Sequence, residues 1–459
     1  MNFYDKIRFK YLFQRKRFLE AIAFYGNENS PIPSDAVWAF YKAGCYRTVV
    51  EARQAPTSGG DAVAIGVSLA ACGDIAAGSR ILREAHSKRL LTPALLSPAA
   101  RAIAQYSPDT ALEILNGQDQ RSNLGLRVAL HLALGHTHQA GEMIKEALDG
   151  DRDTVDPDIL LLHANMTVDH AAKLEDLNSY LATYGLSSLR RKDDSICLSA
   201  SNLVSTAEAG SVRGPLVTVT MPAYNTSGRI GAAIDSLLAQ TYRDIEILVV
   251  DDSSTDDTVA VVTGFTLRDQ RVRLIQRTQN GGPYAARNMA LANANGDFVT
   301  CHDSDDWAHP EKIHRQVEPM LKDRNLNVTA SKWVRIQDDG LFYATQIHPL
   351  TRFNPASPLF RKAPTLSRAG FYENVRTGAD SEYIARLRLI YGQRGYRLLS
   401  LPLAFGAHRA GSLMTDVMTG TKRGEAMNAE RLDYWEAWRK KQARALRYRQ
   451  SLYVGLTTD

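Results

Sequence analysis

Four short apolar runs in the second half of the chain alternate with segments whose apolar residues recur at helical spacing. Near-continuous apolar runs of this length are typical of strands that are buried on both faces. Strands that alternate with helices predict a parallel sheet with helices packed on both sides. The strands are expected over residues 216–221, 245–250, 272–276 and 298–301, and helices over 229–240 and 283–295.

Three carboxylates, those of Asp303, Asp305 and Asp306, follow the last of these runs within four residues. Carboxylates this close raise each other's pKa unless a cation or hydrogen-bond donors keep them ionised. Such a cluster suits a hard divalent ion, Mg²⁺ or Mn²⁺, that would bridge to a substrate phosphate. The alternative is a surface turn in which an aspartate caps the helix after Pro310.

Polar side chains also follow the first two strands: Tyr224 comes after the first, and Asp251 and Asp252 come after the second. Ligands of open parallel sheets bind at the carboxyl ends of strands, so we expect these side chains near the acidic cluster. Asp251 and Asp252 can accept hydrogen bonds from a nucleobase or a ribose hydroxyl. Asp256 and Asp257 belong to a capping box and are expected to serve only the start of a helix.

A turn at Gly281-Gly282-Pro283 begins the next helix, with proline at its first position. This helix carries Arg287 about one turn inside. The guanidinium is expected at the same edge of the sheet, where it suits a diphosphate or a base.

Four segments in this order, residues 219–225, 250–256, 286–288 and 303–306, resemble the motifs of the large inverting family-two glycosyltransferases of the GT-A fold. The resemblance covers residues 214–412, under half of the chain. It implies a nucleotide-diphosphate sugar donor, UDP-linked, and a Mn²⁺ or Mg²⁺ cofactor. The residues that would hold the donor are Pro222, Tyr224, Asn225, Asp251, Asp252, Arg287, Asn288, Asp303 and Ser304. The metal would be held by Asp303, Asp305 and His408, and Asp305 is the better candidate of the two aspartates. Asp306 would only connect the loop to Trp307.

The resemblance also implies a catalytic base at the start of a later helix. Inverting transfer needs a base that takes the proton of the acceptor hydroxyl. Asp380 stands where the family places this base, although Ala379 replaces the glutamate that precedes it in relatives. The alternative is that Asp380 only favours the start of its helix, in which case Glu382 is the second candidate. The chain has no QxxRW motif, which favours addition of one or a few sugars over processive synthesis.

The first 185 residues show short helical stretches broken about every thirty residues. Paired helices at this period resemble tetratricopeptide-type repeats and predict a scaffold that presents a groove to a protein partner or packs on its neighbour. Residues 6–17 combine basic and apolar side chains. We expect a first helix packed inward, with contact to an anionic membrane surface as the alternative. The basic stretch over 425–449 is expected to form a helix that packs back on these repeats, with an interfacial role as its alternative.

Composition excludes several other classes. A net charge of +5, from 55 basic and 50 acidic residues, does not indicate a nucleic-acid binder. Four widely spaced cysteines predict neither disulfides nor a zinc site, which fits a reducing cytosol. The chain has no run of eighteen consecutive apolar residues, and its first residues lack an apolar core with a small-residue cleavage site, so we expect no secretion signal and no membrane span. A cytoplasmic protein, which works at the inner face of the membrane if it contacts lipid, is therefore expected.

The patterns predict four parts: an α-helical repeat domain over 1–185, a linker over 186–214, an α/β domain over 215–415, which the resemblance implies to be a GT-A domain, and a basic helical extension over 416–459. The GT-A domain has a Rossmann-like mixed sheet with helices on both faces. The expected function is transfer of a sugar to a glycan or lipid-linked acceptor, in bacterial surface polysaccharide synthesis by resemblance. One alternative is a sugar nucleotidyltransferase. The other is a helical-repeat adaptor whose transferase domain is inactive. Ala379 favours the inactive adaptor, whereas the intact Asp303/Asp305 pair argues against it.

Overall fold

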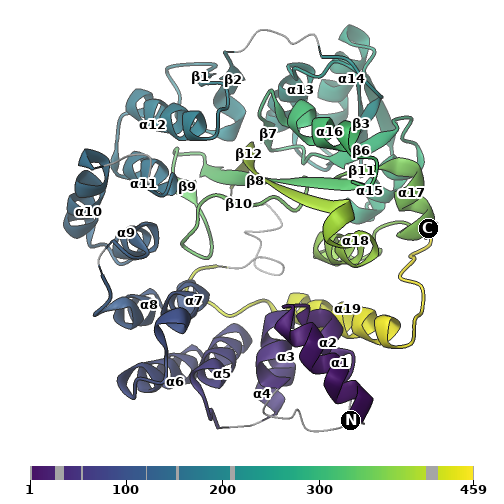
Figure 1. Ribbon diagram of the computed structural model, residues 1–459. Coiled ribbons are helices and arrows are strands. Elements are labelled where there is room, and N and C mark those ends of the chain that lie inside the picture. The colour runs from purple at the N-terminus through teal and green to yellow at the C-terminus, as the bar shows by residue number, and fades with distance from the viewer. Residues whose placement is uncertain are drawn as a thin grey trace. The chain divides into compact units, whose positions relative to one another are not determined.

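The structure is a computed structural model that describes residues 3–25, 36–52, 55–119, 121–150, 155–206, 212–409 and 422–457 (Figure 1). Contacts divide the chain into two compact units. The first comprises Met1–Asp156, Ala344–Pro349 and Ala410–Ser451, and the second comprises Pro157–Tyr343, Leu350–Arg409 and Leu452–Asp459.

A mixed sheet forms the centre of the second unit, with the strand order β5-β4-β3-β6-β11-β8-β12-β7. Its first four strands in space are parallel to one another, as the sequence predicts. They are β3 (Val217–Ala223), β4 (Ile245–Asp251), β5 (Val272–Gln276) and β6 (Phe298–Cys301). The second half is mixed: β11 is antiparallel to β6 and β8, β12 is parallel to β8, and β7 is antiparallel to β12. These strands are β7 (Trp307–Ala308), β8 (Val328–Gln337), β11 (Leu359–Arg361) and β12 (Tyr396–His408), and β9 (Phe342–Tyr343) and β10 (Arg352–Phe353) also pair with β8.

Helices cover both faces of the parallel half because alternate residues of each strand point to opposite sides. Ile247 and Val249 of β4 pack in the core cluster that holds buried residues of α13, α14 and α16. Leu248 and Val250 of the same strand pack against Ala286 and Ala290 of α15 on the opposite face. The expected two-sided burial of the sheet is therefore confirmed. The helices of this unit are α13 (Ser227–Leu238), α14 (Thr258–Arg268), α15 (Pro283–Ala292), α16 (Lys312–Lys322), α17 (Lys362–Arg368) and α18 (Ala379–Gly395).

Two helices that precede the sheet in sequence, α11 (Asp158–Met166) and α12 (His170–Thr183), belong to the second unit. The side-chain amide of Asn165 accepts from the backbone N–H of Phe342 (2.7 Å) and donates to its carbonyl (2.8 Å). The hydroxyl of Tyr180 lies 2.6 Å from that of Thr351. Between α12 and the sheet, β1 (Leu189–Arg191) and β2 (Leu203–Ser205) pair antiparallel, and Ala200–Asn202 forms a 3₁₀ turn.

Helices make up the first unit, and left-handed glycines end two of them at breaks that the sequence predicts. Gly44 and Gly73 have φ values of 82° and 116°, which a side chain would strain. Consecutive helices such as α5 and α6 pack together, and a Cβ at Gly78 would meet the carbonyl oxygen of Gly66 at 2.3 Å. The helices are α1 (Phe3–Gln14), α2 (Phe18–Ile22), α3 (Val37–Ala43), α4 (Tyr46–Glu51), α5 (Gly59–Cys72), α6 (Ile75–Ser87), α7 (Pro93–Ile103), α8 (Pro108–Leu115), α9 (Leu124–Ala133), α10 (Thr137–Asp149) and α19 (Ala429–Arg447).

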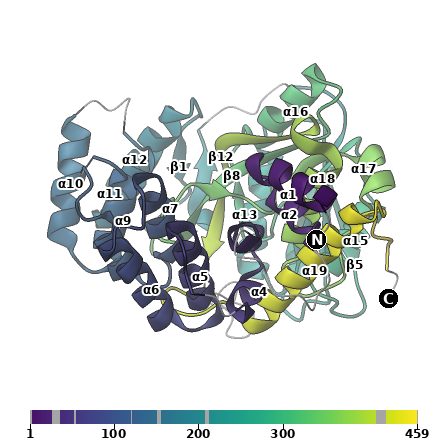
Figure 2. The same cartoon turned by 60° about the horizontal axis from the view of Figure 1, so that its bottom comes forward.

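Helix α19 packs back on the helical unit, as expected. Its Glu436 is buried and accepts hydrogen bonds from the backbone N–H of Arg47 and from the hydroxyl of Thr48 (2.8 Å). These donors lie in the first turn of α4, where a carboxylate satisfies N–H groups that have no partner inside the helix. Figure 2 shows α19 beside α1 and α2.

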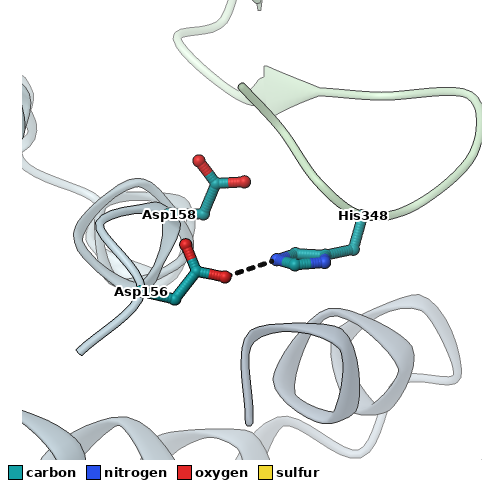
Figure 3. A group of neighbouring side chains, drawn as sticks. All are labelled: Asp156, Asp158 and His348. Atoms are coloured by element: carbon teal, nitrogen blue, oxygen red, sulfur yellow. Dashed lines mark ion pairs between the residues drawn. The ribbon is translucent and has the colours of Figure 1, made fainter. Parts of the chain in front are cut away.

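A short segment from the second half of the sequence, Ala344–Pro349, belongs to the first unit. In it, His348 forms an ion pair with Asp156 at 3.2 Å (Figure 3) and lies 3.0 Å from a guanidinium nitrogen of Arg101. A Cβ at Gly125 would approach the His348 ring to 2.6 Å, so this contact needs glycine. Asp158, also drawn in Figure 3, accepts a hydrogen bond from the backbone N–H of Leu350 at 2.6 Å within the second unit.

All four cysteines lie in described parts of the chain and are free thiols. Within the described ranges, no helix combines the length and the apolar character needed to cross a bilayer.

Candidate active site

The end of β3 provides the first group of predicted residues, Pro222, Tyr224 and Asn225. Strand β3 pairs with β4 along its full length but with β6 only through Thr220. Pro222 therefore lies past the last pair with β6, where the missing N–H of proline costs no sheet hydrogen bond on that side. Tyr224 comes next and is 49% exposed, so its ring is accessible to a ligand.

Asn225 joins the loop after β3 to the loop after β4. Its backbone has φ 49°, in the left-handed region that asparagine tolerates better than most residues. Its side-chain oxygen accepts from the backbone N–H of Thr255 (2.8 Å), and its own N–H donates to the hydroxyl of Ser254 (3.0 Å). Asn225 thus fixes the two loops relative to each other.

Asp251 and Asp252, at the end of β4, are both only 2% exposed. The Oδ2 atom of Asp251 accepts from the backbone N–H of Ser254 at 3.0 Å. Its Oδ1 atom is buried and has no hydrogen-bond partner within the described chain. A buried carboxylate oxygen without a donor is costly, so this atom is suited to an N–H or O–H of a ligand.

Asp252 instead uses both of its oxygens inside the protein. Oδ1 accepts from the Arg277 guanidinium (2.6 Å) and from the N–H of Gly281 (3.0 Å), and Oδ2 accepts from the N–H of Gly282 (2.7 Å). Gly282 precedes the first residue of α15 and has φ 87°. Asp252 therefore holds the turn that starts α15 and, through it, the position of the helix.

Helix α15 carries Arg287 to the acidic loop that follows β6. Arg287 is 6% exposed, and its guanidinium carbon lies 5.3 Å from the centre of the Tyr284 ring and 5.9 Å from that of Tyr372. One guanidinium nitrogen lies 2.6 Å from Oδ1 of Asp303. The next residue, Asn288, exchanges two 2.9 Å hydrogen bonds with the backbone of Tyr372 and so fixes the segment before α18.

The acidic loop brings together the predicted carboxylates, each facing an arginine. Asp303 pairs with Arg287, and Oδ2 of Asp305 accepts from Nε of Arg409 at 3.0 Å. Burial and the charge of Asp303 raise the pKa of Asp305. The side chain of Asp303 is 34% exposed, whereas that of Asp305 is 19% exposed.

Asp306 faces inward. It is buried, and its Oδ1 accepts from the backbone N–H of Ala407 in β12 at 3.0 Å. Burial raises its pKa well above the usual value, and the charges of Asp305 and Asp303 add to this rise. Asp306 thus ties the acidic loop to β12. The neighbouring Ser304 is also buried.

The donor set of this loop suits a hard divalent cation. Asp303 and Asp305 offer carboxylate oxygens, which Mg²⁺ and Mn²⁺ prefer. Within the described residues, no third carboxylate, imidazole or thiol ligand joins them within 4.8 Å. The remaining positions would therefore be filled by substrate oxygens and water. His408, the third predicted ligand, stacks on Tyr343 with ring centres 3.9 Å apart. The following residues of this segment, 410–413, lie outside the described residues.

Two basic residues near the loop were not predicted as part of the site. Lys312 is fully buried, and its Nζ lies 3.3 Å from Nδ1 of His302 and 3.4 Å from the carbonyl of Cys301. Burial lowers its pKa to about 8. In β8, Arg335 has a buried Nε without a hydrogen-bond partner in the described chain. Burial lowers its pKa, while the charge of Asp306 opposes the change. The only sequence signal for Arg335 is an arginine inside an apolar strand. Lys312 lies two residues after Pro310, at the first position of α16, where the sequence indicates only an ordinary helix start.

The predicted base, Asp380, lies in the first turn of α18. Its side chain is partly exposed, and its Oδ1 accepts from the N–H of Ser381 at 2.6 Å. The helix N-terminus stabilises a carboxylate there. The second candidate, Glu382, is 3% exposed and forms hydrogen bonds of 3.0 and 2.6 Å with Arg386, which is also buried. Glu382 therefore serves as the counter-charge of Arg386.

A cluster of tyrosines connects α15 to α18. The Tyr284 hydroxyl accepts from the N–H of Gly378, which caps α18, and the Tyr372 and Tyr383 rings lie 4.2 Å apart. Burial raises the pKa of Tyr372 well above its usual value, with Arg287 opposing and Asp380 adding to the rise. Tyr372 is thus within electrostatic reach of both Arg287 and the predicted base. Ala379 is fully buried in this cluster.

The capping prediction near β4 is correct for Asp256 and wrong for Asp257. Oδ1 of Asp256 accepts from the N–H of Thr258 (3.0 Å), and Oδ2 accepts from that of Ser227 (3.1 Å), so one carboxylate serves the starts of two helices. Asp257 occupies the N-cap position of α14 without a side-chain capping bond.

Comparisons with known proteins match part of the second unit. Residues 218–379 match the sequence model of the glycosyl transferase family 2. An uncharacterized glycosyltransferase of Haemophilus influenzae is 39% identical over 108 residues, which are 24% of this chain and 43% of that protein. Glycosyltransferase GlyG of Streptococcus pneumoniae is 35% identical over 129 residues, 28% of this chain and 42% of the relative. Hyaluronan synthase of Pasteurella multocida is 34% identical over 132 residues, 29% of this chain and 14% of that protein.

Among solved structures, TarS of S. aureus in complex with UDP-GlcNAc has 22% identity and a TM-score of 0.37, over 43% of this chain and 60% of that chain. The chain spans less than half of the length of the curated relatives named above. The family match begins inside β3 and ends at the first residue of α18, so it contains the ends of β3, β4 and β6 but not that of β12. The chain thus carries a family-two glycosyltransferase domain of the GT-A type, preceded by an N-terminal helical region.

Proposed function

We propose that this protein transfers a sugar from a nucleotide-diphosphate donor to an acceptor hydroxyl with inversion at the anomeric carbon. The observation that carries the proposal is the meeting of Arg287 with Asp303, 2.6 Å apart, at the carboxyl ends of parallel strands. Family-two membership of residues 218–379 supports the same reaction class.

The nucleoside would lie over the ends of β3 and β4. The exposed ring of Tyr224 is suited to stacking on a base, and the unpartnered Oδ1 of Asp251 is suited to an N–H of the base or a ribose hydroxyl. Asp252 and Asn225 contribute indirectly, since their side chains hold the loops that shape this surface. We propose UDP as the nucleotide, from the resemblance of these motifs to family-two enzymes.

The diphosphate would lie at the acidic loop. Asp303 and Asp305 would hold Mn²⁺ or Mg²⁺, whose charge stabilises the leaving diphosphate. Arg287 and Arg409 form ion pairs with these carboxylates, and their guanidinium groups would also donate hydrogen bonds to the phosphate oxygens. His408 is proposed as a further ligand on sequence grounds alone.

In the transfer step, the acceptor oxygen bonds to the anomeric carbon as the bond between that carbon and the diphosphate oxygen breaks. The diphosphate leaves with the bonding electrons, and Asp380 takes the proton of the acceptor hydroxyl. Asp380 suits this role better than Glu382, because the latter is buried in its pair with Arg386.

The acceptor is proposed to be a glycan or a lipid-linked glycan in bacterial surface polysaccharide synthesis. Hyaluronan synthase and chondroitin synthase of Pasteurella multocida are among the relatives, which supports a polysaccharide pathway. A cytoplasmic setting and a protein partner on helical repeats remain predictions from the sequence.

A panel of nucleotide sugars with Mn²⁺ tests the proposal, with donor hydrolysis and thermal stabilisation as readouts. A donor that binds the folded state raises the unfolding temperature by mass action. We expect one donor to be hydrolysed and to stabilise the protein, and Asp305→Ala to abolish hydrolysis. Asp257→Ala is the matched control, because Asp257 is an exposed aspartate without a capping bond and should retain activity. If no donor is hydrolysed and none raises the unfolding temperature, the proposed transfer is contradicted and the hypothesis of an inactive adaptor is favoured.

A further inference from the structure

Helix α1 has apolar side chains on two opposite faces. Its inner face holds Phe9 and Leu12, which are buried, and the Phe9 ring packs against that of Tyr25 at 4.6 Å. These residues fulfil the expectation that the first helix packs inward. They use only part of its apolar surface.

The outer face of α1 exposes four large apolar or aromatic side chains. Phe3 is 73% exposed, Tyr4 78%, Ile7 52% and Tyr11 51%. In a helix of about 3.6 residues per turn, these four positions fall on one side, opposite Phe9 and Leu12. We call these four residues the outer stripe. Isolated exposed apolar residues are common, but four on one face of one helix form a contiguous patch.

Basic residues flank the outer stripe on both sides. Lys6 and Lys10 lie along one edge, and Arg8 and Arg15 lie along the other, all exposed. The guanidinium carbon of Arg15 is 4.8 Å from the centre of the Tyr11 ring, so this charge lies directly beside the stripe. Asp5 is the only acidic residue of α1. It lies toward the inner face of the helix and forms an ion pair with Arg447 at 3.5 Å.

From this arrangement we infer that α1 docks on an anionic lipid bilayer, with the outer stripe inserted at the headgroup level and the basic edges against lipid phosphates. Aromatic side chains favour the membrane interface, because their rings are apolar while the tyrosine hydroxyl stays hydrated. Basic side chains on both sides of an apolar stripe match an anionic surface that accepts apolar groups at its centre. A groove in a protein partner would need acidic residues along both of its rims to match the same pattern. The inference concerns the first unit and does not depend on the transferase chemistry.

Co-sedimentation with lipid vesicles tests this inference on the full chain. The probes are vesicles of phosphatidylcholine alone and vesicles in which part of it is replaced by phosphatidylglycerol. We expect binding to the anionic vesicles that weakens as salt is raised, since the basic edges supply part of the attraction. Lys6→Gln with Lys10→Gln should weaken binding roughly 25-fold, from about fivefold for each charge near the surface. Ile7→Ser with Tyr11→Ser should weaken it at least about tenfold, through lost apolar insertion.

Matched controls separate the outer stripe from general surface changes. Val168→Ser with Leu267→Ser removes two other exposed apolar side chains, 90% and 83% exposed, and should leave binding unchanged. Lys88→Gln with Lys145→Gln removes the same charge from two other exposed positions, and binding should again be unchanged. Lys88 is the C-cap residue of α6, and Lys145 lies in α10. All substituted residues are exposed, so unfolding midpoints should match that of the unchanged protein.

Three outcomes would overturn the inference. The first is absence of binding to anionic vesicles. The second is binding that the α1 variants and the controls retain equally. The third is self-association in light scattering that Ile7→Ser with Tyr11→Ser abolishes while vesicle binding persists, which would assign the stripe to a second copy of the chain.

Discussion

The guanidinium of Arg287 lies 2.6 Å from Oδ1 of Asp303 and joins α15 to the acidic loop after β6. The arginine is buried between two tyrosine rings, whereas the side chain of Asp303 is one-third exposed. One partner is therefore fixed by packing, and the other can still reach a ligand. This asymmetry orients the Asp303 carboxylate before any substrate arrives.

A double-mutant cycle on Arg287→Lys and Asp303→Asn should show that the two side chains act as a unit. Lysine loses the planar contact with the tyrosine rings and the fixed direction of the guanidinium. We expect each single variant to lose most donor hydrolysis and the double variant to lose little more. In unfolding free energy the coupling should be about 1–2 kcal/mol. Additive losses in hydrolysis would show that the pair does not function together.

Asp380→Asn should separate catalysis from folding. The side chain is partly exposed at a helix N-terminus, so the unfolding free energy should change by no more than about 0.5 kcal/mol. Transfer to the acceptor should be lost, while thermal stabilisation by the donor is retained, because the base is needed only for the acceptor proton. Normal turnover in this variant would show that another group is the base.

Glu382→Gln should have the opposite profile. It leaves the buried guanidinium of Arg386 without its counter-charge, which costs about 3–5 kcal/mol of unfolding free energy. Chemical denaturation of the two variants side by side measures the contrast. A Glu382→Gln protein as stable as the unchanged chain would show that the pair is not a structural requirement of α18.

Asp256 should make stability depend on pH in the acid range. Burial alone would raise its pKa, but hydrogen bonds from Thr258 and Ser227 dominate and lower the pKa to about 2 from an ordinary 3.8. A carboxyl group with a depressed folded-state pKa stabilises the protein above its unfolded-state pKa, and this contribution is lost as pH falls toward the folded-state value. The stability advantage over Asp256→Asn should therefore shrink between pH values of about 4 and 2.

Urea titrations at a series of pH values measure this difference. Asp257→Asn serves as the control, since the Asp257 side chain makes no capping bond. A difference between the Asp256→Asn variant and the unchanged protein that stays constant across this range would contradict the assigned role.

Ala379→Glu should destabilise the protein, although it introduces the glutamate that the family-two resemblance places before the base. Ala379 is fully buried in the cluster that contains Tyr372 and Tyr383, so a carboxylate there would lose its hydration. We expect a loss of at least about 2 kcal/mol in unfolding free energy, measured by denaturation, with no gain in transfer. A stable variant with faster transfer would show that the surrounding residues admit a second carboxylate.

Much of the second unit follows from local pattern. The strands β3, β4, β5 and β6 are predicted from the sequence because short, continuous apolar runs between helical segments are typical of buried strands. The placement of Asp251 at the same edge of the sheet as the acidic loop follows from the same rule, since parallel strands place their carboxyl ends along one edge. The order of the strands in the mixed half of the sheet was not predictable in this way. There β12 lies between β8 and β7, which come much earlier in the chain.

The roles of individual side chains depended on contacts between distant segments. Asp251 and Asp252 look equivalent in the sequence, but Arg277 and the glycines before α15 take up both oxygens of Asp252 and leave one of Asp251 unpartnered. Asp380 and Glu382 lie two residues apart, and only the second faces Arg386 inside the protein.

The sequence by itself determined which elements form and which residue types gather at the strand ends, because both follow from local periodicity and from the direction of parallel strands. Only the tertiary structure decided which carboxylates are already neutralised by buried donors and which can still bind a ligand. The same holds for α1, whose pattern predicts an amphipathic helix but cannot distinguish its inner face from the outer stripe. The physical reason is that burial and pairing depend on partners that are close in space and far apart in the chain.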